Sequence, residues 1–231
     1  MHAVTITEKA TEALRQALVK GVFAQSDRIT EKAACEYLAI SRTPVRAALQ
    51  ALAQEGLLAY EPQRHYRIRR FSAKDIADAY SVRAVLEGLA CRIVAEAGLA
   101  EATEAILRSC IETGDALVAD ADTAFDHARW REMNVAFHNA ILDAAGNETL
   151  KSAARHAEKV PLATMSVIAD WAATPDYTLM RMAQIDHRYI FECLRTGAGA
   201  RAEARMREHI AVASDLLVER IEKQQGSSDG G

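Results

Sequence analysis

Glycine and proline are scarce in this chain, with 11 and 4 among 231 residues, and aromatic residues make up only 6%. Because both glycine and proline interrupt helices, their scarcity favours long uninterrupted ones. Alanine is abundant and runs of β-branched residues are few, which argues against a predominantly β fold. Hydrophobic residues make up 50% of the chain, enough for one large or two modest cores. The composition therefore predicts a mostly α protein.

Cysteine is also sparse, and its four copies show no paired spacing: Cys35, Cys91, Cys110 and Cys193. We therefore expect reduced thiols in a cytoplasmic protein rather than a disulfide framework. No apolar run reaches about 18 residues, so we expect no membrane span. We also expect no signal peptide.

The net charge of −4 conceals an asymmetry along the chain. Residues 1–70 hold 11 Lys and Arg against 7 Asp and Glu, a local charge of +4, so the remainder carries −8. A small basic domain joined to a larger acidic one is typical of a nucleic-acid reader attached to a sensor. Chance variation over a short window explains a difference of this size equally well.

The segment 30–56 has the pattern of two short helices joined by a turn of about three residues. Thr30 can cap the first helix and Ser41 the second, and Gly56 ends it. The second helix has one apolar face, made by Val45, Ala48, Leu49 and Leu52. Two helices joined so tightly form a helix-turn-helix.

Arg42 and Arg46 lie four residues apart, so both project from the exposed face of the second helix near its N-terminus, beside the hydroxyl of Thr43. Guanidinium groups in such a position can contact guanine in the major groove of a duplex. A helical hairpin that only packs has the same pattern, so this segment alone leaves DNA binding and plain packing open.

Two strand-like runs follow, at residues 57–60 and 66–69, with the polar loop 61–65 between them. Helix, helix and hairpin together predict a winged helix-turn-helix. Arg64 and His65 lie at the tip of the hairpin, where a basic wing can contact phosphates or the minor groove.

The run from Ser41 to Leu57, Ser-Arg-Thr-Pro-Val-Arg-x-Ala-Leu-x-x-Leu-x-x-Glu-Gly-Leu, resembles the N-terminal domain of GntR-type bacterial transcription regulators. The resemblance covers residues 5 to 72. It implies that Arg42 and Arg46 read an operator and that Lys32 in the preceding helix also contacts DNA. The DNA-binding residues that we expect are Lys32, Ser41, Arg42, Thr43, Arg46, Arg64 and His65. The chain departs from the family in having Ala39 and His65 where glycine is usual.

Further helices are predicted from Ser72 onward, where a new capped helix begins. Their expected ranges are 72–97, 101–120, 122–145, 148–169 with a kink at Pro161, 177–196 and 200–224. Helices of this length with short loops pack as an antiparallel bundle of six or seven. We therefore expect a DNA-binding domain at 1–71, an all-helical domain at 72–224 and a disordered tail at 225–231.

Three histidines occupy core-like positions on three of these helices: His138, His187 and His209. Asn134 precedes His138 by four residues and so shares its helix face. Three imidazoles from three helices could bind a divalent metal and leave positions open for water or a ligand. Spacing alone leaves this open, because a single histidine on a helix is more often a structural core residue than a ligand.

Residues 72–224 resemble the FCD effector domain of the FadR subgroup of the GntR family. The first matching motif is Arg-x-x-Leu-Glu, from Arg83 to Glu87. The second runs from Asn134 to Leu150 and consists of Asn-x-x-x-His followed by Ala-Gly-Asn and a leucine. The last two are the later His187 and the run Met-x-x-His-Ile from Met206 to Ile210. The resemblance implies that His138, His187 and His209 ligate zinc, nickel or another divalent ion. Asn134 then stands in the fourth place, where a neutral amide binds a metal less strongly than a carboxylate.

The same resemblance implies that the metal and Arg83 together hold a small carboxylate effector. Arg83 can form a bidentate pair with an organic acid, and it can equally form an internal ion pair with Glu87. Tyr80, one helical turn earlier, could add a hydroxyl group.

We therefore expect a cytoplasmic, homodimeric repressor that reads a palindromic operator in double-stranded DNA and responds to a small carboxylate. One alternative is a regulator with a metal-free pocket for an apolar or acyl ligand. The other is a helical metalloenzyme. Against the enzyme, none of the three histidines has Glu three residues before it, and no nucleophile elbow, P-loop or dinucleotide-binding motif is present.

Overall fold

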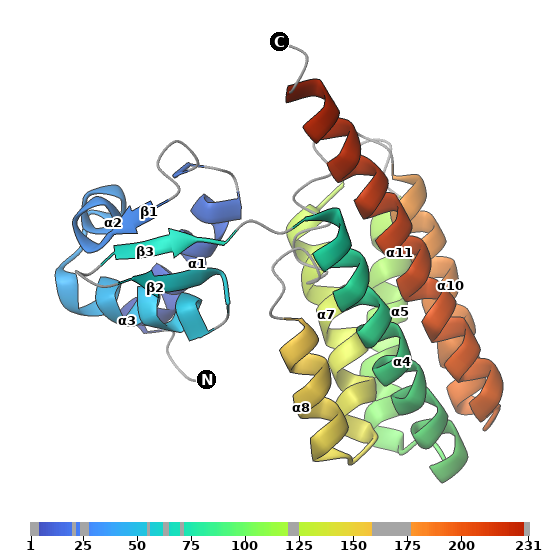
Figure 1. Ribbon diagram of the computed structural model, residues 1–231. Coiled ribbons are helices and arrows are strands. Elements are labelled where there is room, and N and C mark those ends of the chain that lie inside the picture. Colours follow the sequence, from blue (N-terminus) through green and yellow to red (C-terminus); the bar gives the residue numbers. More distant parts are fainter. Residues whose placement is uncertain are drawn as a thin grey trace. The chain divides into compact units, whose positions relative to one another are not determined.

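The computed structural model describes residues 5–19, 22–23, 28–54, 56–61, 65–69, 72–119, 125–158 and 177–228 (Figure 1). The chain divides into two compact units, and the second begins at Ser72. Within the described ranges, no helix is both long and apolar enough to cross a membrane.

The N-terminal unit combines three helices with a small sheet. Its helices are α1 (Ile6–Val19), α2 (Glu31–Leu38) and α3 (Arg42–Gln54), and its strands are β1 (Arg28–Thr30), β2 (Leu58–Glu61) and β3 (His65–Ile68). The strands pair antiparallel in the order β1-β3-β2, with Ile29 opposite Tyr66 and Tyr60 opposite Tyr66 on the other side. The predicted winged helix-turn-helix is confirmed, and β1 is a third strand that was not predicted from the sequence.

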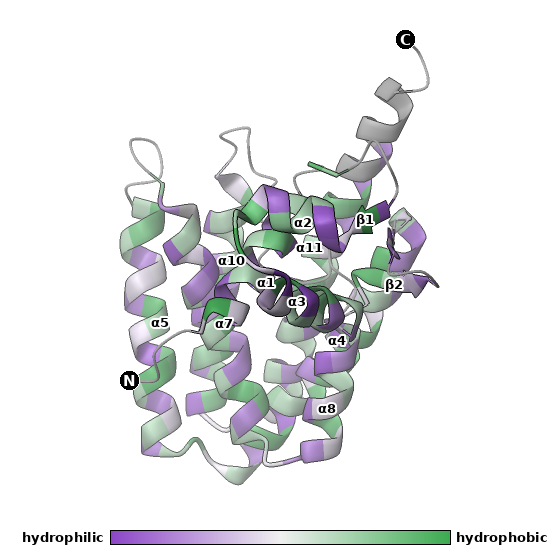
Figure 2. Ribbon diagram, turned by 90° about the vertical axis from the view of Figure 1, so that its left-hand side faces the viewer, coloured by the Kyte–Doolittle hydropathy of each residue, from purple (hydrophilic) through white to green (hydrophobic). Residues whose placement is uncertain are grey.

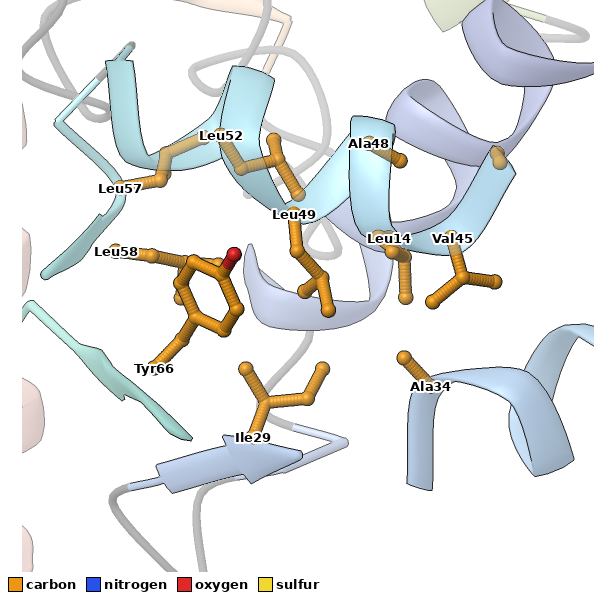
Figure 3. Close-up of a cluster of buried hydrophobic side chains, with 11 residues drawn as sticks. Leu14, Ile29, Ala34, Val45, Ala48, Leu49, Leu52, Leu57, Leu58 and Tyr66 are labelled. Atoms are coloured by element: carbon orange, nitrogen blue, oxygen red, sulfur yellow. The ribbon is translucent and has the colours of Figure 1, made fainter. Parts of the chain in front are cut away.

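The core of this unit lies between the helices and the sheet (Figure 3). Leu14 of α1 and Leu49 of α3 meet Ile29 and Tyr66 from the strands, and all four side chains are buried. The missed strand β1 is explained by this core. A three-residue strand has no recognisable alternation, and β1 forms because pairing with β3 brings Ile29 into the interior.

Thr30 caps α2 as predicted, its side chain accepting a hydrogen bond from the Ala33 amide. The turn that follows contains Ala39 with a φ of 54°, a left-handed conformation that usually favours glycine. This conformation ends α2 abruptly and allows α3 to begin at Arg42, so the helix-turn-helix forms without a glycine at this position.

The second unit contains six helices in its described part: α4 (Ala73–Ala97), α5 (Glu101–Ala119), α7 (His127–Ala144), α8 (Glu148–Ala157), α10 (Thr178–Arg195) and α11 (Gly199–Ser228). Hydrophilic and hydrophobic segments alternate along α5, α7 and α8, as expected of amphipathic helices (Figure 2). The helical bundle predicted from the sequence is confirmed.

Helices α4 and α11 run antiparallel in close contact, which glycine permits. A Cβ atom added at Gly88 of α4 would lie 2.7 Å from Cγ of Arg207 on α11, and one at Gly199 would lie 2.8 Å from Cγ of Glu96. The close approach of these two helices brings together the segments that carry Glu87 on α4 and His209 on α11.

The inner face of α4 is not the one that its large apolar residues suggest. Val85 and Leu89 are 48% and 40% exposed. The inner face of α4 instead runs through Ile76, Tyr80, Arg83, Glu87, Cys91 and Val94. Hydrophobic periodicity did not identify this face because it includes a buried ion pair.

Helix ends also differ from the expected ranges. Helix α7 begins at His127, capped by Asp126, and not at 122. Helix α11 continues to Ser228, past the expected end at 224 and into the stretch predicted to be disordered. The predicted kink at Pro161 lies outside the described residues.

Candidate functional site

Helix α3 presents a polar face opposite its buried one. Pro44, Val45, Ala48, Leu49 and Leu52 are buried, whereas Ser41, Arg42, Thr43 and Arg46 are exposed. Lys32 on α2 is 81% exposed in its side chain and lies 3.8 Å from Glu36. The residues predicted to contact DNA on these two helices are therefore accessible. His65 begins β3 and is half-buried, while Arg64 lies outside the described residues.

Arg46 is not isolated on this face. Its Nε donates to Oε1 of Glu31 at 2.8 Å, and its Nη2 donates to Oε2 at 3.0 Å. This bidentate pair, and Coulomb attraction to the same carboxylate, raise the pKa of Arg46. This pair was not predicted from the sequence, because Glu31 and Arg46 belong to different helices and lie 15 residues apart.

In the second unit, the three predicted histidines converge. His138 of α7, His187 of α10 and His209 of α11 are all buried, and one ligand atom from each lies within 4.8 Å of the others. The rings of His138 and His209 stack with centroids 5.4 Å apart, and those of His187 and His209 lie 4.8 Å apart. Three separate helices therefore bring three imidazoles to one point, as the sequence predicted.

Each imidazole has an oxygen near its Nδ1 atom. The Nδ1 of His138 lies 2.5 Å from Oε2 of Glu87, that of His187 lies 3.4 Å from Oε1 of Gln184, and that of His209 lies 3.5 Å from Oδ2 of Asp186. Such partners fix the ring orientation and direct the other nitrogen, Nε2, toward the centre of the cluster.

The inward atoms have no protein partner. Across the described part of the chain, no hydrogen-bond partner reaches Nε2 of His138, His187 or His209, or either side-chain atom of Asn134. Buried polar atoms without partners are rare, because each costs about 1–3 kcal/mol. Three imidazole nitrogens and an amide oxygen suit a divalent transition metal such as zinc. The residues therefore fit such an ion.

The protonation states suit ligation as well. Burial, and then the nearby His209 and His138, hold the pKa of His187 well below its ordinary value. Burial also lowers the pKa of His209, against the opposing effect of Asp186. Both rings are neutral near pH 7 as a result, and neutral imidazole is the form that binds metals.

A buried ion pair lies beside the cluster. Arg83, 1% exposed, approaches Oε1 of Glu87 through Nε at 2.9 Å and Nη2 at 2.8 Å. Its guanidinium carbon also lies 5.2 Å from the ring centroid of Tyr80. Burial alone would raise the pKa of the Glu87 carboxyl, but Arg83 and His138 together lower it to about 2. Glu87 is therefore an anion that links the arginine to a histidine of the cluster.

Three other residues of this region were not predicted from the sequence. Gln184 and Asp186 orient two of the histidines, and Gln184 Nε2 donates to Ile111 O at 2.9 Å and to Asp115 Oδ1 at 2.6 Å. Glu158, at the end of α8, is electrostatically coupled to Arg83, and burial raises the pKa of its carboxyl. Asp186 directly precedes His187 in the sequence, and this adjacency was the only sign that it lies near the cluster.

Two family models match the sequence. The model of the FCD domain matches residues 78–212, more than half of the chain, and that of the bacterial regulatory proteins of the gntR family matches residues 6–68. The second range ends just before the helical unit that begins at Ser72, and the first lies within that unit.

Two relatives come from Bacillus subtilis (strain 168). The uncharacterised HTH-type transcriptional regulator YdhC is 27% identical over 143 residues, which span 62% of this chain and 62% of that relative, less than two thirds of its length. The HTH-type transcriptional regulator LutR is 28% identical over 195 residues, or 80% of this chain and 89% of LutR. Among solved structures, E. coli McbR/YncC shares the fold, with a TM-score of 0.71 at 19% identity, covering 94% of this chain and 99% of that one.

These matches agree with the winged helix-turn-helix and the helical bundle described above, and the family comprises regulators rather than enzymes. The chain is therefore a DNA-binding transcription regulator of the GntR family, in the FadR subgroup whose members carry an FCD domain.

Proposed function

We propose that this regulator senses a small carboxylate through a divalent metal bound in its FCD domain. The observation that carries the proposal is a set of three buried Nε2 atoms that have no hydrogen-bond partner among the described residues. Glu87, Gln184 and Asp186 direct these atoms together. A cluster that was only structural would leave three buried acceptors unsatisfied.

In this proposal His138, His187 and His209 ligate the ion, and Asn134 offers its amide oxygen in the fourth place. A zinc or similar ion supplies a Lewis acid that can accept a carboxylate oxygen. The buried amide of Asn134 has two atoms without protein partners, so it can accept or donate toward whatever occupies the centre.

Arg83 is the proposed second contact for the effector. Its guanidinium is buried and positively charged. Glu87 joins it to the cluster, because this carboxylate contacts both Arg83 and His138. Nε of Arg83 donates to Oε1 of Glu87 at 2.9 Å, and a guanidinium can bind a carboxylate in a bidentate fashion. Tyr80 adds a hydroxyl to the proposed effector contacts, and Glu87 contributes to them by holding Arg83 in place.

On the DNA side, we propose that Arg42 and Arg46 read bases, while Lys32, Ser41, Thr43, Arg64 and His65 contact DNA beside them. A homodimer would place two such heads on a palindromic operator. Such a dimer would act as a repressor that leaves the operator when the effector binds. Effector binding would change the relative placement of the two DNA-binding units and so weaken their affinity for the operator.

Thermal unfolding of the full-length protein against a panel of small organic acids tests the proposal. A ligand that binds only the native state stabilises it by about 2.7 kcal/mol at 100 times its dissociation constant. The proposal predicts an increased melting temperature with one class of acid, lost after chelator treatment and restored by zinc. If acyl or apolar ligands stabilise chelated protein instead, the pocket is metal-free and the proposal is wrong.

A further inference from the structure

Arg46 and Glu31 form a bidentate ion pair on the exposed face of the helix-turn-helix. The two hydrogen bonds are parallel, 2.8 and 3.0 Å long, and join the Nε–Nη2 edge of the guanidinium to both oxygens of the carboxylate. This geometry fixes the plane of the guanidinium as well as its position, which a single contact would not do.

Glu31 is the anchored member of the pair. Its side chain is 13% exposed, against 46% for that of Arg46. It is the first residue of α2, directly after the capping residue Thr30, where the helix dipole favours a negative charge. Its charge also contributes, after burial, to raising the pKa of Tyr66 in β3. Glu31 is therefore the more buried member of the pair, and its two hydrogen bonds restrict Arg46.

The pair leaves part of the guanidinium available. Of the five N–H donors of an arginine, Glu31 engages those of one edge, and the Nη1–Nη2 edge retains a donor on each nitrogen. Two adjacent donors match the O6 and N7 acceptors of guanine in the major groove. An arginine whose plane is already fixed loses less conformational freedom on binding and tolerates fewer alternative contacts.

We propose that Glu31 is a positioning residue for sequence reading, which orients Arg46 so that its outer edge selects guanine in the operator. This inference rests on the proposed role of Arg46 as a base-reading residue. It assigns specificity to an acidic residue that itself opposes DNA binding, because a carboxylate near phosphates weakens affinity for every duplex.

The proposal separates specificity from affinity. Replacing Glu31 by Gln removes a negative charge, so binding to any duplex should become tighter. The same change removes one of the two acceptors that fix the guanidinium plane, so preference for the operator should fall. The ratio of operator affinity to random-duplex affinity should therefore decrease by about tenfold, within the 1–3 kcal/mol that a bidentate contact contributes to discrimination.

The experiment begins with selection of an operator from a random duplex library by the full-length protein. Dissociation constants for that duplex and a scrambled duplex are then measured at one salt concentration for wild type, Glu31→Gln and Arg46→Lys, and for the double variant. Glu36→Gln is the matched control, since it removes the same charge from an exposed position on the same helix. Its specificity ratio should stay at the wild-type value.

The double variant distinguishes positioning from a general structural effect. Lysine cannot form the two-bond pair, so Glu31→Gln should leave the ratio unchanged in the Arg46→Lys background. Glu31→Asp, which keeps the charge but shortens the side chain, should lower the ratio without tighter random binding, and it serves if Glu31→Gln does not fold.

Two results would overturn the inference. One is an unchanged ratio in Glu31→Gln and Glu31→Asp, and the other is an increased ratio, which would mean that Glu31 holds Arg46 away from DNA. Failure of the wild-type protein to select any sequence would instead contradict the proposed function of the DNA-binding unit.

Discussion

His138 and Glu87, which lie on different helices, are joined by a 2.5 Å contact between ring Nδ1 and carboxylate Oε2. The other oxygen of the same carboxylate accepts from Arg83. Glu87 therefore connects the histidine cluster with the buried arginine. A carboxylate behind a ligating imidazole also increases its basicity and fixes its tautomer.

Replacing Glu87 by Gln should weaken zinc binding by about 10–100-fold, the usual effect of removing a partner behind a ligating histidine. It should also destabilise the metal-free protein by about 3–5 kcal/mol, because Arg83 would remain charged and buried without its partner. Zinc titration by calorimetry and urea unfolding measure the two effects. Glu112→Gln, at an exposed position on α5, is the control and should change neither.

Gly114 is the basis of a second prediction, because it makes room for the side chain that orients His187. A Cβ atom at this position would lie 2.6 Å from Cδ of Gln184. Gly114→Ala should therefore displace Gln184, lower stability by about 1–3 kcal/mol and weaken zinc affinity. Gly114→Ala combined with Gln184→Ala restores space but not the orienting oxygen. Stability should recover only in part in that double variant, because the hydrogen bonds from Gln184 to Ile111 and Asp115 are lost, while zinc affinity stays low. Recovery of zinc affinity would refute the orienting role.

Asn134 allows a test of the fourth ligand position. Asn134→Asp places a carboxylate beside the ion, and the added charge should tighten zinc binding by about tenfold or more. Without metal, the same buried charge should destabilise the fold, so the rise in melting temperature on adding zinc should become larger. Asn139→Asp, one position beyond His138 and half-buried, provides a comparison. Equal effects at both positions would remove Asn134 from the metal site.

The pKa of His187 predicts how stability depends on pH. Folding lowers this pKa well below the ordinary value of 6.5, so the unfolded chain takes up a proton at higher pH than the folded one. The stability due to neutral His187 is therefore complete above about pH 6.5 and lost as pH falls below it. Urea unfolding of chelated protein between pH 7.5 and 5.5 should show this loss. His187→Phe, which can still pack against Phe137, should flatten the dependence.

Arg42 tests base reading without involving Glu31. Arg42→Ala should weaken operator binding by about 5- to 150-fold, the range for one bidentate contact to guanine, and affect a random duplex much less. Equal weakening on both duplexes would mean that Arg42 contacts phosphates only. Dissociation constants measured at a fixed salt concentration distinguish these outcomes.

Much of this architecture could be predicted from residue patterns. The apolar spacing of Val45, Ala48, Leu49 and Leu52 was sufficient for α3, and motif resemblance placed three distant histidines together. The inner face of α4 was harder, because Arg83 and Glu87 are charged and are buried only through mutual pairing. Strand β1 was not predicted because it is stabilised by pairing with β3, which is distant in the sequence.

The partners of the site residues were the least predictable part. Glu31 reaches Arg46 across the turn, and Gln184 reaches Asp115 of α5 from α10. Contacts between helices depend on how the helices pack, and no local spacing encodes them. The role of Gly114 was equally unpredictable, because nothing near it in the sequence indicates that Gln184 lies against it.

Metal content decides whether His138, His187 and His209 hold a divalent ion through their Nε2 atoms, as we propose. It should be measured in protein purified without chelator, for the wild type and for the His187→Phe variant. We expect about one zinc or similar ion per chain in the wild type and strong depletion in the variant. If the wild-type protein carries no metal and binds none on titration with zinc, cobalt or nickel, the histidine cluster is not a metal site.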